Sequence, residues 1–365
     1  MAAMHPRRFW FFRTVALGLL LFTAKCATAQ TPSPALLVLE KSDDSLAIVD
    51  PASLKILGRV PVGQDPHEII TSPGGKVAYI SNYGGNDSNL NTIAVVDLVA
   101  RKPLPSINLG ALRSPHGLAF SGGKLYFTVE TNKAFGRYDP ATQKIDWVLG
   151  TGQDRTHMIE VSERFDRIFT SNVTSGTISI IEQVMPSPPP QTAPAGGAPP
   201  PGAGPGPGAP RKTWKIENVA SGRGCEGFDV SPDGKEIWAA NALDGTVTII
   251  DVASKKAVQT FPISVNHANR LKFTPDGQRV LVSGLGPGAS SKGSNLEIVD
   301  AATHKEIKQL NLGGGSAGIL IVPDGSRAYV AVSEKNRVAV VDLKSLEVTG
   351  EIQTGKQPDG LAWVP

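Results

Sequence analysis

Short apolar runs of five or six residues recur along the chain, each bounded by Gly, Pro, Asp or Asn. One kind of run follows a tight turn, as in "VAYISN" (77–82), "EIWAAN" (236–241) and "RAYVAV" (327–332). A second kind ends on an acid, as in "IAVVD" (93–97) and "VTIID" (247–251). Runs this short, rich in Val and Ile and closed by turn formers, are typical of β-strands rather than helices. We therefore predict an all-β protein.

The turns before the first kind of run are nearly identical: "SPGGK" (72–76), "SPDGK" (231–235), "TPDGQ" (274–278) and "VPDGS" (322–326). Pro presets φ and Gly supplies a positive φ, as a tight link between antiparallel strands requires. After each acid comes a more polar run, typical of an exposed edge strand. Four strands per unit, seven units and a period of about 40 to 50 residues predict one seven-bladed β-propeller.

The two ends of the chain predict how this propeller closes. Residues 36–63 supply three strands with no innermost strand before them, while "DGLAWVP" (359–365) is an innermost strand with nothing after it. We expect the C-terminal strand to complete the first blade, because closure removes the free edges of an open sheet.

The second strand of several units carries a family resemblance. "YISN" (79–82), "FTSN" (169–172) and "WAAN" (238–241) resemble the YVTN-type β-propeller repeat of secreted and surface-layer proteins, which is related in fold to the propeller lactonases. The resemblance implies the propeller fold. It leaves the function open, because this architecture serves binding scaffolds, lactonases and electron-transfer enzymes alike.

The first 29 residues have the pattern of a secretory signal peptide. Three arginines and no acid precede a nine-residue apolar run (14–22), and a small-x-small site ends at Ala29. Nine apolar residues fall short of the roughly 20 that span a bilayer. We predict cleavage after Ala29, a mature propeller of residues 30–365, no membrane span in it, and export to the periplasm or the cell exterior by the Sec or the twin-arginine route.

One segment interrupts the repeat. Residues 186–210 are nearly all Pro, Gly and Ala, a composition that cannot bury a core. They stand between "TISIIEQ" (177–183) and "TWKIENV" (213–219), which read as the third and fourth strands of one blade. We predict a disordered insertion inside blade four, on the face opposite the channel mouth described below.

Charge and cysteine content narrow the class of partner. The full chain carries a net charge of +3, and removal of the four basic residues in 1–29 leaves −1. The basic residues are spread evenly, so we expect no nucleic-acid partner. Cys225 is the one cysteine of the mature chain, which excludes an intrachain disulfide. We expect a monomer stabilised by burial.

Three innermost strands begin with the same phrase, "DPHEII" (65–70), "SPHGLAF" (114–120) and "RTHMIEV" (155–161). In a propeller these strands line the central channel, so the matching position of all seven blades should form a ring at its mouth. This channel ring consists of His67, His116, His157, Glu226, Asn269, Ala317 and Asp359. Basic residues lie beside it, namely Arg113, Arg155, Arg223, Arg270 and Lys356.

The long loops 83–91 and 284–295 should overhang the same face. A polar, partly walled mouth of this kind is a default place for a ligand. The first function that we predict is an exported binding protein or scaffold for a small anionic ligand, a glycan or a partner protein. No Gly-x-Ser-x-Gly elbow, phosphate loop or haem-attachment motif stands in the sequence.

Two enzymatic alternatives remain open. In a lactonase-like hydrolase, Glu226 or His157 would activate water, and Arg155 or Arg223 would stabilise the oxyanion of an opening sugar lactone.

In a metal-dependent oxidoreductase, the ring histidines His67, His116 and His157 would share a zinc or copper ion. The oxygen donors of the remaining arc suit calcium better. A quinone site would need Trp238 or Trp363 as an aromatic platform. The sequence itself requires no cofactor, although a divalent metal fits the residue types.

Overall fold

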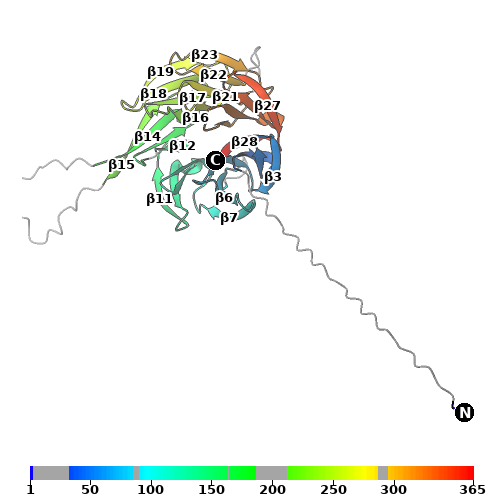
Figure 1. Ribbon diagram of the computed structural model, residues 1–365. Coiled ribbons are helices and arrows are strands. Elements are labelled where there is room, and N and C mark those ends of the chain that lie inside the picture. Colours follow the sequence, from blue (N-terminus) through cyan, green and yellow to red (C-terminus); the bar gives the residue numbers. More distant parts are fainter. Residues whose placement is uncertain (3–32, 85–89, 163, 186–211, 287–294) are drawn as a thin grey trace, which may run out of the picture.

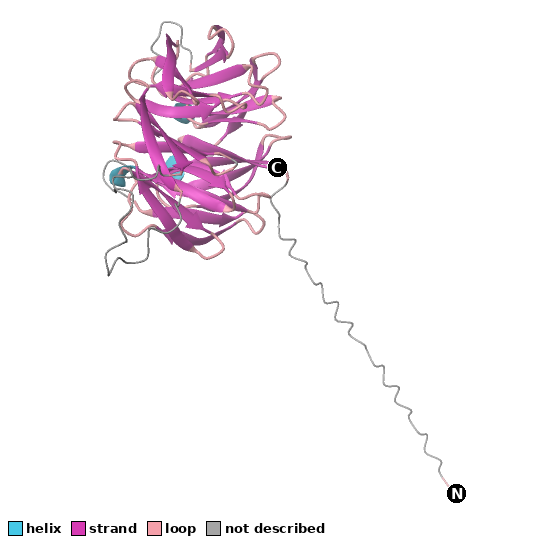
Figure 2. Ribbon diagram, turned by 90° about the vertical axis from the view of Figure 1, so that its left-hand side faces the viewer, coloured by secondary structure: helices cyan, strands magenta, loops and turns pink. Residues whose placement is uncertain are grey.

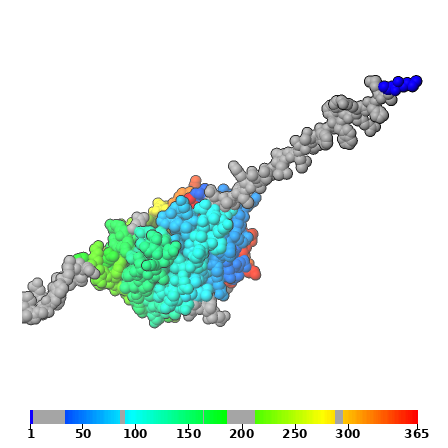
Figure 3. All heavy atoms as spheres, turned by 90° about the horizontal axis from the view of Figure 1, so that it is seen from below, coloured from blue at the N-terminus to red at the C-terminus, as the bar shows by residue number. Residues whose placement is uncertain are grey.

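The computed structural model describes residues 1–2, 33–84, 90–162, 164–185, 212–286 and 295–365. Within these residues, 28 strands form seven four-stranded antiparallel sheets around one axis (Figures 1 and 2). The space-filling view shows successive blades side by side, from blue through cyan to green (Figure 3). The predicted all-β, seven-bladed propeller is confirmed.

Each blade runs from an innermost to an outermost strand. Blades one to four contain, in this order, β28 (Pro358–Val364), β1 (Ala35–Glu40), β2 (Ser45–Asp50), β3 (Lys55–Pro61); β4 (Pro66–Thr71), β5 (Val77–Asn82), β6 (Thr92–Asp97), β7 (Lys102–Asn108); β8 (Pro115–Ser121), β9 (Lys124–Val129), β10 (Ala134–Asp139), β11 (Lys144–Gly150); and β12 (Thr156–Val161), β13 (Arg167–Asn172), β14 (Thr177–Val184), β15 (Thr213–Ala220).

Blades five to seven follow the same order. They contain β16 (Cys225–Val230), β17 (Glu236–Asn241), β18 (Thr246–Asp251), β19 (Lys256–Pro262); β20 (Ala268–Phe273), β21 (Arg279–Gly284), β22 (Leu296–Asp300), β23 (Glu306–Leu310); and β24 (Ile319–Ile321), β25 (Arg327–Val332), β26 (Arg337–Asp342), β27 (Glu347–Gln353). Short 3₁₀ turns follow β1, β9 and β25: η1 (Lys41–Asp43), η2 (Glu130–Asn132) and η3 (Ser333–Lys335).

The core lies between adjacent blades, where their sheets pack face to face. Leu37 and Leu46 of blade one share a buried cluster with Ile80 and Val96 of blade two. The second strands are buried on both faces, and for this reason they read as continuous apolar runs. The outermost strands are largely exposed, and in β3 and β11 exposed residues alternate with half-buried ones.

In every blade except blade four, the third strand ends on an acid that closes the following turn. The carboxylate of Asp97 accepts hydrogen bonds from the backbone N–H groups of Val99 and Ala100, each at 2.8 Å. Asp342 binds the backbone of Lys344 and Ser345 in the same way, at 3.0 and 2.7 Å. The recurrent acid in the sequence is therefore a turn-forming residue.

The sheet order β28-β1-β2-β3 confirms that the C-terminal strand completes blade one. In Figure 1 the C terminus lies at the centre, beside the blue strands of this blade. The buried Glu40 carboxylate binds across the closure, accepting the Gly355 N–H at 2.7 Å, the Ser45 hydroxyl at 2.6 Å and the Arg59 Nε–H at 2.8 Å.

Two parts of the sequence prediction lie outside the described residues. β14 ends at Val184 and its sheet neighbour β15 begins at Thr213, so the insertion 186–210 separates two paired strands of blade four. Nearly all of the predicted signal peptide, 1–29, also falls outside, and its cleavage stays a prediction. Among the described residues, no helix is long and apolar enough to cross a membrane.

Hydroxyl groups on the second strands β9, β13 and β21 join their blades to the next blade. Thr128 accepts the Gly117 N–H at 2.8 Å and donates to the carbonyl of His157, in the next blade, at 2.6 Å. Ser171 likewise donates to the Glu226 carbonyl at 2.5 Å. The Ser or Thr in the second strand therefore holds the backbone of the neighbouring ring residue in place.

Gly117 allows the close approach that these bonds require. A Cβ at this position would lie 2.5 Å from the His157 carbonyl oxygen and 2.7 Å from the Met158 Cα. Gly227, Gly318 and Gly360 stand against the backbone of the next blade in the same manner. The glycine after the ring residue thus serves blade packing.

We expect Gly117→Ala to destabilise the fold by about 1–3 kcal/mol, because the methyl group must displace the backbone of β12. Urea denaturation followed by tryptophan fluorescence measures the effect. Gly150→Ala is the matched control, because a Cβ there meets no atom within 4 Å. Equal stability of the two variants would contradict this account of blade packing.

Candidate functional site

The structure brings all seven positions of the channel ring to one cavity. This mouth cavity has a volume of about 100 Å³ and is lined by His67, His116, His157, Glu226, Asn269, Ala317 and Asp359, together with Lys41, Tyr83, Arg155, Arg270 and Leu285. Tyr83 and Leu285 come from the described ends of the two loops that were predicted to overhang this face.

A bulge at the start of the innermost strand directs the ring side chains. In blades two, three and four, the pairing register between the innermost and the second strand shifts at the ring histidine. The shift lies between Pro66 and Ile69, between Pro115 and Leu118, and between Thr156 and Ile159. Blades five, six and one show the same shift around their ring residues. A bulge bends a strand and re-aims the side chain at the extra position.

The residue two places before each of these six ring positions adopts the left-handed conformation. These residues are Asp65, Ser114, Arg155, Gly224, His267 and Gln357, with φ between 52° and 71°. Arg155 lines the mouth cavity from this position. His267 brings its Nε2 atom within 3.8 Å of the Glu226 carboxylate.

The basic residues three places before the ring do not reach the cavity. Arg113, Arg223 and Lys356 are exposed and do not line it. Arg223 instead pairs with Asp244 at 2.7 Å. The prediction that Arg113 and Arg223 belong to the site is therefore not supported by their positions, because a shift of one residue in this turn changes the direction of the side chain.

Glu130 anchors the site although the sequence reading missed it. Its buried carboxylate binds His157 Nδ1 through Oε1, while Oε2 accepts the Tyr83 hydroxyl at 2.6 Å and the Arg155 Nε–H at 3.3 Å. Because the carboxylate occupies Nδ1, His157 presents Nε2 to the cavity, 3.7 Å from Glu226 Oε1. Glu130, His157 and Glu226 thus form a carboxylate–imidazole–carboxylate line.

The protonation of Glu130 is set by these partners. Burial alone would raise the pKa of the carboxyl group, but the hydrogen bond from His157, the charges of His157 and Arg155 and the Tyr83 hydroxyl outweigh burial and lower the pKa to about 2. Glu130 is therefore ionised across the physiological range, and it orients the imidazole of His157 as a permanent anion.

This shift predicts a pH dependence of stability. A carboxyl group whose pKa is lower in the folded than in the unfolded chain stabilises the fold above the unfolded value, 4.5, and loses that contribution as the pH falls toward 2. At neutral pH the contribution is about 3 kcal/mol. We expect the stability gap between the wild type and Glu130→Gln to narrow from pH 6 to pH 3 in urea titrations; a constant gap would contradict the assignment.

Three buried polar atoms at the mouth cavity have no hydrogen-bond partner within the described part of the chain: His116 Nδ1, His157 Nε2 and Asn269 Oδ1. The three residues are only 2 to 3% exposed. Buried polar groups in proteins are almost always hydrogen-bonded, so unmet capacity at one place indicates a site for a polar ligand or water.

The imidazole rings of neighbouring ring histidines lie close together and are tilted against one another. The centroids of His116 and His157 lie 3.7 Å apart with 33° between the rings, and those of His67 and His116 lie 5.3 Å apart. Burial, and then the charges of His157, His67, Arg270 and Arg155, lower the pKa of His116 well below its usual value. His116 is therefore a neutral imidazole that offers one donor and one acceptor.

The cations at the cavity are already paired. Lys41 Nζ lies 3.0 Å from Asp359 Oδ2, Arg270 Nη2 lies 2.5 Å from Glu68 Oε1, and Arg155 contacts Glu130 as described. Glu226, in contrast, faces imidazole nitrogens, at 3.7 Å from His157 and 3.8 Å from His267. The polar atoms of the site that are available to a ligand are therefore mainly hydrogen-bond acceptors.

The metal and quinone alternatives gain no support from this geometry. Among the described residues, no group of three His, Cys, Asp or Glu side chains is arranged to hold a metal ion. Trp238 is buried in the core and Trp363 packs on Tyr329, so neither lines the cavity.

The missed residues share one position in the repeat, directly after the second strand. In blade order these residues are Lys41, Tyr83, Glu130, Val173, Ala242, Leu285 and Ser333. Lys41, Tyr83 and Leu285 line the cavity, and Glu130 binds His157. The alignment that located the channel ring could have located this second set as well, because both positions recur in every blade.

Comparisons with known proteins identify the fold. No protein-family model matches the chain, and no curated protein matches it. Among solved structures, it is similar to a Bacteroides fragilis protein assigned as a 6-phosphogluconolactonase (16% identity, TM-score 0.68, 92% of this chain and 99% of that chain).

The chain is also similar to the hydrazine synthase of Kuenenia stuttgartiensis (19% identity, TM-score 0.63, 81% of this chain and 89% of that chain). The dihydro-heme d1 dehydrogenase NirN is a third relative in structure (16% identity, TM-score 0.59, 90% of this chain and 75% of that chain). At these identities the likeness shows the propeller fold alone.

Proposed function

We propose that the chain is an exported binding protein whose mouth cavity takes a small, neutral, hydroxyl-rich molecule of the sugar or sugar-lactone class. The observation that carries the proposal is the set of three unpartnered buried atoms on one cavity. Export rests on the signal-peptide pattern of the first 29 residues.

The chemistry of the open positions favours hydroxyl groups. With its Nδ1 on Glu130, the neutral form of His157 offers Nε2 as a hydrogen-bond acceptor, and Asn269 Oδ1 and the Glu226 carboxylate are acceptors beside it. A hydroxyl group donates to such acceptors and can also accept from the guanidinium of Arg155, whose side chain is 44% exposed.

The charge balance favours a neutral ligand over an anionic one. Lys41, Arg155 and Arg270 each have a carboxylate partner, and the Glu226 carboxylate is an additional negative charge that would repel an anion. The cavity has room for about three water molecules. It therefore fits the hydroxyl-bearing edge of a ring, with the rest of the ligand at the open mouth.

Calorimetric titration with D-glucose, myo-inositol and D-gluconate tests this proposal. We expect one of the neutral polyols to bind at least tenfold more tightly than gluconate, and Asn269→Leu, which replaces the amide by an apolar group of similar size, to weaken that binding at least tenfold. Arg113→Gln is the control outside the cavity. Tighter binding of gluconate, or an unchanged affinity of Asn269→Leu, would overturn the proposal.

A second candidate function, hydrolysis of a sugar lactone, is favoured by the Glu130–His157 pair. His157 Nε2 can take a proton from water as the water oxygen attacks the lactone carbonyl, and Arg155 is placed to stabilise the oxyanion. The ring C–O bond then breaks, and the leaving alkoxide takes up the proton. Alkali consumption at constant pH with D-glucono-1,5-lactone, above the spontaneous rate, tests this candidate.

A further inference from the structure

A second cavity lies deeper in the channel and is larger than the first. This deep cavity, of about 390 Å³, is lined by all seven innermost strands, through residues that follow the ring positions. On β12, for example, His157 lines the mouth cavity, whereas Met158 and Glu160 line the deep cavity. The two cavities therefore follow one another along the same channel.

A buried ion pair stands between the two cavities. Arg270 lines the mouth cavity and Glu68 lines the deep cavity, and their side chains meet at 2.5 Å. Burial would lower the pKa of Arg270, but the charges of Glu68, Asp359 and Glu226 raise it, so the guanidinium stays charged. Glu68 and Arg270 thus neutralise each other and separate two sites.

Most of the residues that line the deep cavity are apolar, although polar and apolar atoms share its exposed surface. Leu118, Phe120, Met158, Phe228 and Ile319 are among these lining residues. Besides Glu68, which is paired, the charged residues at the deep cavity are Glu160, Asp229 and Lys272 on three successive blades. A cavity of this size, with mostly apolar lining residues and a few convergent polar groups, has the composition of a small-molecule site.

Two carboxyl groups, those of Asp229 and Glu160, lie beside the single ammonium group of Lys272 in the deep cavity. Lys272 Nζ lies 2.5 Å from Asp229 Oδ1, and Asp229 Oδ2 accepts the Phe273 N–H at 2.7 Å. Glu160 Oε1 is 3.6 Å from the same Lys272 Nζ, and this buried oxygen has no hydrogen-bond partner among the residues that the structure describes. One ammonium group therefore binds Asp229 closely and pairs with Glu160 only at a longer distance.

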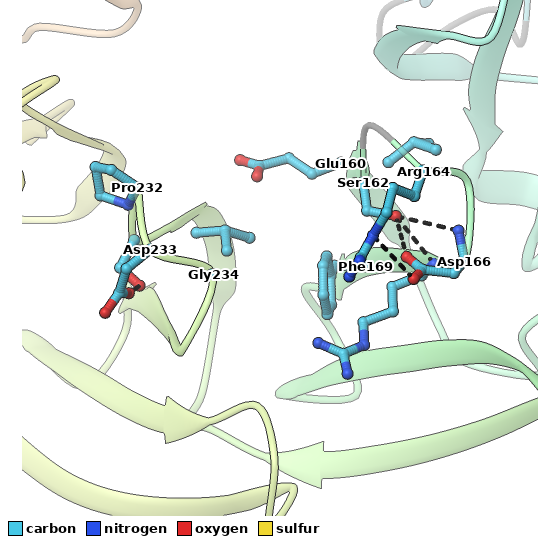
Figure 4. Close-up of a pocket in the computed structure, with 12 residues that line it drawn as sticks. Glu160, Ser162, Arg164, Asp166, Phe169, Pro232, Asp233 and Gly234 are labelled. Carbon is cyan, nitrogen blue, oxygen red and sulfur yellow. Dashed lines mark hydrogen bonds and ion pairs between the residues drawn. The ribbon is translucent and has the colours of Figure 1, made fainter.

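The deep cavity is reached from the face opposite the channel mouth. A groove of about 620 Å³ between blades four and five shares Glu160 and Val161 with it. Figure 4 shows the Glu160 carboxyl in the opening between the turn that carries Ser162 and Arg164 and the turn that carries Pro232 and Gly234. A ligand can enter by this route without passing the mouth cavity.

From this arrangement we infer that the deep cavity is a second ligand site, which takes an organic cation with an apolar body. The ammonium group would pair with Glu160, and the body would lie against Leu118, Phe120 and Phe228. A metal ion fits less well, because no three-ligand group for one is present among the described residues and most of the lining residues are apolar. This inference does not depend on the proposed function of the mouth cavity.

The protonation of Glu160 gives the inference a specific signature. Burial and the charge of Asp229 raise the pKa of Glu160 well above its usual range, which favours the protonated carboxyl group in the free protein. A cation bound beside it favours the ionised form. Binding of the ammonium ligand should therefore release about one proton per site at neutral pH.

Calorimetric titration of the mature chain with 4-phenylbutylammonium, 4-phenylbutanol and 4-phenylbutyrate tests the inference. We expect the ammonium compound to bind at least tenfold more tightly than the other two, with proton release measured from the dependence on buffer ionisation heat. Glu160→Gln should lose the proton release and at least tenfold in affinity for the ammonium compound, yet keep wild-type binding of polyols at the mouth cavity.

Two variants distinguish this site from the mouth cavity. Asn269→Leu should leave the binding of 4-phenylbutylammonium unchanged, and Glu160→Lys, which places a positive charge where the ammonium group would pair, should abolish that binding while thermal unfolding confirms the fold. Equal affinity for the ammonium compound and the alcohol, an unaffected Glu160→Gln, or a loss in Asn269→Leu instead would overturn the inference. Failure of polyols to bind the wild type would concern the mouth cavity alone.

Discussion

Deletion of Pro358–Pro365 is expected to leave a chain that does not fold into a stable propeller. These residues contain β28, the innermost strand of blade one, which pairs with β1 from Ala35↔Val364 to Glu40↔Pro358. Without β28, the fully buried strand β1 would become an unpaired apolar edge. The deletion also removes Asp359 from the channel ring and Trp363 from its contact with Tyr329 of blade seven.

Circular dichroism and size-exclusion chromatography measure the effect as loss of the cooperative unfolding transition and of the monomer peak. A synthetic peptide of residues 355–365 should restore both in part. The same peptide with Gly360→Val should not, because a side chain at Gly360 meets the His67 carbonyl oxygen at 2.5 Å. A truncated chain that unfolds cooperatively at the wild-type midpoint would contradict the role given to β28.

The fold could be predicted from the sequence because its signals are local and repeated. Turns such as 231–235 and the acids that end the third strands each fix one hairpin or one turn, and seven copies fix the architecture. The closure of blade one followed from counting strands at the two ends. These inferences need no knowledge of side-chain direction, which is why they succeeded.

The candidate site could be predicted only in part, because side-chain direction depends on single residues. Arg155 and Arg113 both stand just before a ring histidine, but Arg155 is two places before His157 and Arg113 three before His116. The left-handed residue and the bulge that separate these outcomes leave no mark in the composition. Glu130 was missed for a different reason, since its position after the second strand was not compared between blades and its partner His157 lies 27 residues away.

The contacts of the mouth cavity also change the class of ligand that we expect, from an anion to a neutral molecule. From residue types alone, the arginines and lysines near the ring favoured an anionic ligand. The structure pairs Lys41 with Asp359, Arg270 with Glu68 and Arg155 with Glu130, so these cations have partners before any ligand arrives. Pairing is a property of three-dimensional neighbours, and for this reason a count of charges along the chain could not reveal it.

The second large expected effect is the loss of lactone hydrolysis when His157 is replaced. If the protein hydrolyses lactones, His157→Gln is expected to lower kcat at least 100-fold, because the imidazole Nε2 that faces the cavity is the group placed to take the proton from water. Hydrolysis of D-glucono-1,5-lactone at constant pH measures the loss. Arg113→Gln is the matched control, since it changes a basic residue beside the ring that does not line the cavity.

The variant Glu130→Gln tests whether Glu130 acts by orienting the imidazole of His157 or by its negative charge in the cavity. The amide keeps a hydrogen-bonding group near His157 Nδ1 but removes the charge that orients the ring, so we expect a loss of about 10- to 100-fold in kcat with little change in KM. Because Glu130 acts through His157, it should have no further effect in the His157→Gln background. Additive losses would instead assign Glu130 a role of its own, and a wild type without turnover would leave polyol binding as the function of the cavity.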